Sequence, residues 1–310
     1  MTSQQDLVGA LNACFSADKQ QRDHATEFLM TNSGTPGLTG MMMDLISDAS
    51  CEPVLRTSAA ANLYSLIQRS WNPEDSPYPP IPDEDKAACK ARVIGLMLEV
   101  PGALFKSVSG ALQVMVAHEF PHNWPELMPL LVERLQAEDP NVVICILKTV
   151  NSVLKFYRNK PNTAAYVADL LAVLKDFAGP LRAIAEGYSA QFDSYQGNDE
   201  VLSMLLTMIK LIWEIFLSLT SIDLPQVFLD ELPFWMELLR KFLIYTSDST
   251  VLTHGDDDLT SEPGPLTKVH SSVIRVLAQF VKKYDDEVEP YIQPLLGDVW
   301  GVLERVGALA

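Results

Sequence analysis

Apolar side chains recur at helical spacing along nearly the whole chain. Leu55, Ala59 and Leu63 follow one another four residues apart, which places them on one face of a helix. The same spacing returns in segments 141–158 and 200–219, where further apolar residues widen the stripe. Stripes this wide are typical of helices that are contacted from more than one side. Since no run of strict alternation is bounded by hairpin turns, the pattern predicts an all-α fold.

Prolines and turn residues divide this pattern into separate helices. Asp139-Pro140 has the form of an N-cap followed by proline at the first helical position. Segment 72–82 holds five prolines and predicts an extended connector, and the acidic segment 254–265 predicts a mobile loop. The remaining segments predict helix pairs over 4–16 with 20–32, 38–49 with 54–71, 83–99 with 102–119, 124–137 with 141–159, 164–192 with 199–220 and 224–246 with 265–284, and a further helix from about 287.

The spacing of the pairs predicts a repeat architecture. Three of the second helices open at Pro53, Pro101 and Pro140, which are 48 and 39 residues apart and bracket the period of HEAT-type repeats, roughly 40–47 residues. We therefore expect an α-solenoid of HEAT-type helix pairs that forms a superhelical arch, with the whole of 1–310 as one array. Segment 291–310 has no polar capping helix, so we expect the chain to be the N-terminal part of a longer array.

The charge of the chain narrows its range of partners. The formal net charge is −17 and the pI is about 4.6, which disfavours nucleic acid and anionic membrane surfaces and favours partners with basic surfaces. Four separated cysteines with no metal-ligand spacing predict buried thiols of a reducing compartment. The most apolar stretch, 201–219, carries Lys210 and Glu214 in its middle, which predicts a buried helix rather than a membrane span.

One string has the form of a zinc-protease motif. His118, Glu119 and His122 match HExxH, in which two histidines one helical turn apart bind the metal. That chemistry needs a continuous helix, whereas Pro121 ends the helix before the second histidine. We therefore predict no metal site here.

No other motif predicts catalysis or a cofactor. The chain has no GxGxxG sequence, no P-loop and no GxSxG sequence, and the acidic run Asp256, Asp257 and Asp258 lacks the spacing of a calcium loop. We expect neither an enzyme nor a bound cofactor or metal.

Three stretches resemble the importin-β (karyopherin) family of HEAT-repeat nuclear transport receptors. Residues 22–29, RDHATEFL, are similar to the family's RxxAExxL. Residues 56–71, RTSAAANLYSLIQRSW, resemble RxxAAxxLKNxIxxxW, and 119–127, EFPHNWPEL, resemble DFPxxWPEL. The third match gives the HExxH string another meaning, because it is a corner between helices in which Trp124 packs the turn. The resemblance implies an importin-β N-terminal-like region over about 1–160 and further HEAT repeats over about 161–310.

Longer stretches resemble one member of the family, which returns importin-α to the cytoplasm. They lie at 85–98, 107–127, 223–228, 235–236 and 283–300, in collinear order. The resemblance implies Ran-GTP-dependent nuclear export of importin-α, contact with nucleoporins, and shuttling between nucleus and cytoplasm. The alternatives are an importin-type karyopherin that carries protein cargo into the nucleus and a Ran-independent HEAT scaffold.

The family places Ran against the second helices of the N-terminal repeats, here 54–71, 102–119 and 141–159. In the second motif this chain departs from the family, with Tyr64-Ser65 in place of Lys-Asn, and with Gln68 where the similar member is basic. Exposed positions on these helices are the candidate partner-binding residues for Ran or importin-α: Tyr64, Ser65, Gln68, Gln113, Lys148 and Lys155.

Overall fold

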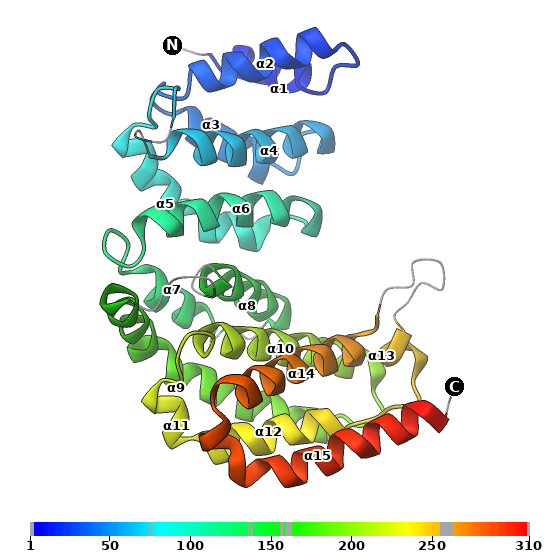
Figure 1. The fold of residues 1–310 in the computed structure, drawn as a ribbon. Coiled ribbons are helices and arrows are strands. Elements are labelled where there is room, and N and C mark those ends of the chain that lie inside the picture. Colours follow the sequence, from blue (N-terminus) through cyan, green and yellow to red (C-terminus); the bar gives the residue numbers. More distant parts are fainter. Residues whose placement is uncertain are drawn as a thin grey trace. The chain divides into compact units, whose positions relative to one another are not determined.

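Every regular element that the structure describes is a helix (Figure 1). The computed structural model describes residues 3–72, 74, 76–135, 137, 139–155, 158, 163–254 and 263–308. The acidic run Asp256, Asp257 and Asp258 lies outside these ranges. The helices form two compact units, Met1–Leu127 and Met128–Ala310, each with its own buried apolar core. The predicted all-α fold is confirmed.

Unit 1 consists of three consecutive helix pairs, at the positions that the apolar pattern predicts. First helices stack on first helices (α3 on α5) and second helices stack on second helices (α4 on α6). Pro53 opens α4 at its first position, as predicted. The pairs are α1 (Gln4–Ala13) with α2 (Lys19–Thr31), α3 (Leu38–Ser47) with α4 (Pro53–Ser70), and α5 (Asp83–Glu99) with α6 (Gly102–Glu119).

A buried carboxylate joins the second pair of unit 1 to the third. The N-cap of α3 is Gly37, whose φ of 82° suits glycine and which has no side chain to cap the helix. Asp85 of α5 supplies the missing acceptor, since it accepts from the Gly37 N–H at 2.9 Å and from the Thr39 hydroxyl at 3.0 Å. A carboxylate at a helix N-terminus satisfies free N–H groups and complements the helix dipole.

Glu119 makes a second polar tie within unit 1. The Trp71 indole N–H at the end of α4 donates to its Oε1 at 3.0 Å, and Lys90 of α5 donates to its Oε2 at 3.1 Å. Lys90 also donates to the carbonyl of Asn123, at 3.1 Å, in the corner that follows α6. Trp71, the last residue of the second family-like motif, therefore contacts Glu119, the first residue of the third.

Unit 2 contains both the longest and the shortest of the described helices, and they match the predicted segments with three exceptions. Helix α7 begins at Leu127 rather than at 124, because the corner that contains Pro125 is not helical. Segment 224–246 forms two helices, with Pro233 near the start of the second, and the short α13 has no predicted counterpart. The helices are α7 (Leu127–Arg134), α8 (Pro140–Lys155), α9 (Ala164–Ser194), α10 (Asp199–Leu219), α11 (Gln226–Asp230), α12 (Leu232–Ile244), α13 (Thr250–His254), α14 (Pro265–Lys283) and α15 (Asp285–Ala308).

Helix α10 is the centre of unit 2. It packs against α8, α9 and α14 (Figure 1), and both of its faces carry buried apolar side chains. Phe216 stacks on Trp235 of α12 with ring centroids 4.5 Å apart, and on Phe280 of α14 at 5.8 Å. Among the described residues, α10 is the one helix long and apolar enough to cross a membrane, and most of it is buried inside the unit.

A buried glutamate ties α10 to α8. Glu214 accepts from the Asn151 amide at 2.5 Å and from Lys210 at 3.1 Å, and Lys155 lies 4.0 Å away. Burial raises the pKa of Glu214, but Lys210, Lys155 and the Asn151 amide outweigh burial, so this pKa lies below its ordinary value. Glu214 is therefore ionised at neutral pH although only 9% of the residue is exposed.

We expect Glu119→Gln to lower the free energy of unfolding by about 1–2 kcal/mol, because Lys90 loses a charged hydrogen bond that is mostly shielded from water. Urea unfolding, followed by circular dichroism, measures this change. Glu126→Gln is the matched control, since Glu126 is exposed in the same corner. Equal unfolding midpoints for the two variants would show that the Glu119 carboxylate does not stabilise the fold.

We expect Glu214→Gln to destabilise the protein by about 1–3 kcal/mol at pH 7. A carboxylate whose pKa is lowered by folding stabilises the fold above its unfolded pKa, and that contribution is lost as the pH falls through the folded value. The difference between wild type and Glu214→Gln should therefore shrink below about pH 4.5. Thermal melting across this pH range tests it, with exposed Glu200→Gln on the same helix as the control. A difference that stays constant with pH would contradict the assignment.

Candidate partner-binding surface

The six predicted partner-binding residues lie on second helices in both units. Unit 1 contributes three residues on α4 and one on α6, and unit 2 contributes two residues on α8. Of the six, the exposed ones are Gln68, Gln113, Lys148 and Lys155, whereas Tyr64 and Ser65 are half-buried.

Tyr64 lies in the seam between two second helices. A Cβ atom at Gly110 of α6 would lie only 3.1 Å from the Tyr64 ring, so the ring packs directly on the backbone of α6. Glycine at this position leaves the space that the ring occupies. Tyr64 therefore has a packing role, and its contact with a partner stays a prediction.

Gln68 and Gln113 lie on neighbouring helices, since α4 packs against α6. Their amides can both donate and accept hydrogen bonds, which suits a polar protein surface. Neither amide makes a hydrogen bond to another residue in the described part of the chain. Stacking of second helices brings these two predicted residues to one region of unit 1.

Four of the second helices, α4, α6, α8 and α14, carry far less negative charge than the chain as a whole. Helix α4 has two arginines and no acidic residue, and the one acidic residue of α6 is Glu119, which Lys90 and Trp71 already engage. In unit 2, α8 and α14 contain no acidic residue, whereas α15 has six. The prediction of basic partners from the net charge therefore does not extend to these helices, because the acidic residues lie mainly elsewhere.

Lys155 belongs to a larger charged group that the sequence did not reveal. It lies beside Glu214 of α10, whose other neighbours include Lys210 and Arg158. Lys155 and Arg158 lie 52 to 59 positions before Lys210 and Glu214, so no local motif links the two halves of the group. The signal that the sequence did offer was the complete lack of acidic residues in α8 and α14.

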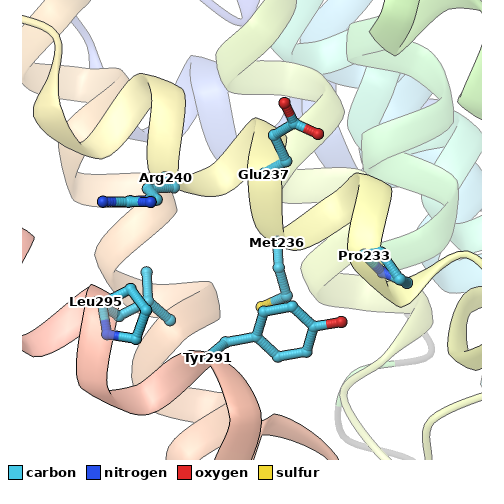
Figure 2. Close-up of a pocket in the computed structure, with 7 residues that line it drawn as sticks. Pro233, Met236, Glu237, Arg240, Tyr291 and Leu295 are labelled. Carbon is cyan, nitrogen blue, oxygen red and sulfur yellow. The ribbon is translucent and has the colours of Figure 1, made fainter.

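A shallow cavity also lies between α12 and α15 (Figure 2). Its volume is about 270 Å³, and it is lined by the apolar side chains of Met236 and Leu295 and by the polar side chains of Tyr291 and Glu237. Arg240 at its edge pairs with Asp298 at 2.5 Å. The lining offers no paired acid and base and no nucleophile beside a base, so its chemistry suits an apolar side chain rather than a reaction.

The HExxH string does not form a metal site. Helix α6 ends at Glu119, and Phe120 has an extended backbone with φ −90° and ψ 140°, so His118 and His122 do not share a helical face. Within the described ranges, no three His, Cys, Asp or Glu side chains are grouped as metal ligands would be. The four cysteines are free thiols, of which Cys89 is buried and the others are partly exposed.

Two family models match the chain. The model described as importin-beta N-terminal domain matches residues 25–99, which run from α2 to the end of α5. The Cse1 model matches residues 153–309, just over half of the chain. The predicted division at about residue 160 stays a prediction; the two compact units meet at Leu127.

The most similar relatives are exportins by name. The chain is 29% identical to exportin-2 of Danio rerio and 28% identical to exportin-2 of Homo sapiens, in each case over 98% of this chain and 31% of the relative. The chain thus spans about a third of the length of these relatives. Their names agree with the prediction that the protein is not an enzyme.

A solved structure supports the fold. The structure titled "The exportin Cse1 in its cargo-free, cytoplasmic state" superposes on 97% of this chain and 32% of its own, with a TM-score of 0.87 and 21% sequence identity. This likeness confirms the predicted HEAT-type solenoid fold. With the Cse1 model covering more than half of its residues, the chain belongs to the Cse1 family, the exportin-2 family.

Proposed function

We propose that this protein is a nuclear transport receptor that carries importin-α out of the nucleus together with Ran-GTP. The observation that carries the proposal is the presence, on one chain, of an importin-beta N-terminal domain and a Cse1 region. The resemblance to the importin-β family implies Ran binding, and the resemblance to exportin-2 implies importin-α as cargo. The protein would then shuttle between nucleus and cytoplasm and contact nucleoporins on its way.

In this proposal the second helices hold Ran. Helices α4 and α6 present Gln68 and Gln113, and their one acidic residue is Glu119, which Lys90 and Trp71 engage. In unit 2, α8 presents Lys148 and Lys155. Hydrogen-bonding amides and ammonium groups suit a polar protein partner that buries little apolar surface.

Cooperation between Ran-GTP and cargo follows from the repeat architecture. Each helix pair contacts mainly its neighbours, so a stack of pairs bends at many small joints. A partner that spans several pairs must order these joints, and a second partner then binds at a lower entropic cost. Thermodynamic linkage makes the effect reciprocal, so Ran-GTP tightens importin-α binding by the same factor. Hydrolysis of GTP releases Ran and thereby weakens the binding of importin-α.

Two alternatives give different results in one experiment. An importin of the same family releases cargo on Ran-GTP, and a Ran-independent HEAT scaffold does not distinguish Ran-GTP from Ran-GDP. The Cse1 region over 153–309 favours the exportin.

We expect the protein, in its full natural length, to bind Ran-GTP in preference to Ran-GDP, and importin-α to tighten Ran-GTP binding by about 5- to 150-fold. Isothermal titration of the protein with each form of Ran, with and without importin-α, measures both effects. Weaker binding of Ran-GTP in the presence of importin-α would indicate an importin. Equal affinity for the two nucleotide states would indicate a scaffold.

We expect the double variant Gln68→Glu and Gln113→Glu to weaken Ran-GTP binding about tenfold, or ~1.4 kcal/mol, without changing the melting temperature. Both side chains are exposed, and the change replaces amide donors with negative charge. The matched control is Gln4→Glu with Gln5→Glu on α1, where both glutamines are also exposed. An equal loss of Ran-GTP affinity in the two double variants would show that Gln68 and Gln113 are not part of the binding surface.

A further inference from the structure

A cluster of four cations surrounds one carboxylate on the second helices of unit 2. Lys210 Nζ lies 3.1 Å from a Glu214 oxygen, and Lys155 Nζ lies 4.0 Å from the other. Arg158 donates to the Glu214 backbone carbonyl at 2.6 Å, and Arg275 of α14 is close enough to act on the charge of Arg158. We call this group, Lys155, Arg158, Lys210, Arg275 and Glu214, the cationic cluster.

The carboxylate offsets only part of this charge. Glu214 is ionised, so the cluster keeps a net charge of +3. Arg158 uses its Nε and one Nη for the Ser218 hydroxyl and the Glu214 carbonyl, both of which are neutral acceptors. Burial lowers the pKa of Arg158; the Glu214 carboxylate raises this pKa, and the neighbouring Arg275 lowers it. Arg275 has no ion pair with any carboxylate among the residues that the structure describes.

Three of the four cations are more exposed than the carboxylate, whereas Arg158 is half-buried. The Lys155 side chain is 49% exposed and that of Lys210 is 29% exposed, against 11% for Glu214. Arg275 is exposed on α14, and α14 packs on α10 as α8 does (Figure 1). The three helices therefore present one cationic face, and neither α8 nor α14 supplies an acidic residue to neutralise it.

Like charges held this close repel one another unless negative charge compensates them. Lys210 and Lys155 both help to keep the buried Glu214 ionised, but its single negative charge neutralises at most one of the four cations. Positive charge therefore remains on this face. Such an excess is what a binding site for anions requires.

We infer that the cationic cluster binds a short carboxylate-rich segment of a partner protein. The net charge of −17 decides between the possible anions, because the rest of the surface repels a long polyanion such as nucleic acid. At physiological salt, charges are screened beyond about 8 Å, so a short acidic segment interacts with the cluster and little with the remaining surface. The inference does not rest on the proposed function, since a scaffold could use the same face.

The test uses a short fluorescent oligoglutamate peptide and a DNA oligonucleotide long enough to extend beyond the cluster over the surrounding acidic surface. Fluorescence anisotropy is measured on the 310-residue chain at low and at physiological salt. The two exposed cations are reversed together, as Lys155→Glu with Arg275→Glu. Two separate controls are Lys175→Glu, an exposed cation on α9, and the milder pair Lys155→Gln with Arg275→Gln.

We expect the peptide to bind the wild type more tightly than the oligonucleotide does. The charge-reversal pair should weaken peptide binding at least about tenfold, the Gln pair less, and Lys175→Glu hardly at all. Circular dichroism melting shows whether each variant is folded, and the Gln pair keeps the test valid if the reversal pair is not. The inference is overturned if the oligonucleotide binds more tightly, if the wild type binds no peptide, or if Lys175→Glu weakens binding as much as the reversal pair.

Discussion

Helices α4 and α10 have wider apolar faces than their own partners can cover, and this excess determines how the neighbouring pairs are arranged. In unit 1 the excess is buried where α4 meets α6 and α3 meets α5, and in unit 2 where α10 meets α8 and α14. Stacking of like helices leaves one line of each second helix free. Gln68, Gln113, Lys148 and Lys155 are exposed on these helices, whereas Tyr64 and Ser65 are half-buried.

Hydrogen bonds to buried or half-buried carboxylates fix the register between packed helices, which apolar contacts alone would leave undefined. Asp85 caps α3 from the next pair, Glu119 holds Trp71 and Lys90, and Glu214 joins α8 to α10. Each is a carboxylate with directional donors, so each sets a register between elements that Leu and Val would not. The false metal motif has its explanation here: Glu119 is a structural acceptor at the end of a helix.

Much of the fold follows from the sequence, because prolines and helical spacing are local signals. Pro53 and Pro140 begin helices where expected, and the apolar stretch that begins at 201 is the central helix of unit 2. The corner at 119–127 lies where the resemblance implies it, but the helix after it begins at Leu127 rather than at 124. The break between α11 and α12 was not predicted, since a single proline does not say on which side a helix resumes. The site was harder to predict. The sequence predicts an exposed Tyr64, whereas its ring packs on Gly110. Lys155, a neighbour of Glu214 in space, lies far from it in the sequence.

We propose that second helices form the face that binds Ran in its GTP state. Hydrogen–deuterium exchange of the protein with Ran-GTP, and separately with Ran-GDP, tests it without any substitution. We predict slower amide exchange in α4 and α6 with Ran-GTP, little change in α3 and α5, and no comparable effect of Ran-GDP. Protection of the first helices instead, or the same protection by both forms of Ran, would contradict the claim.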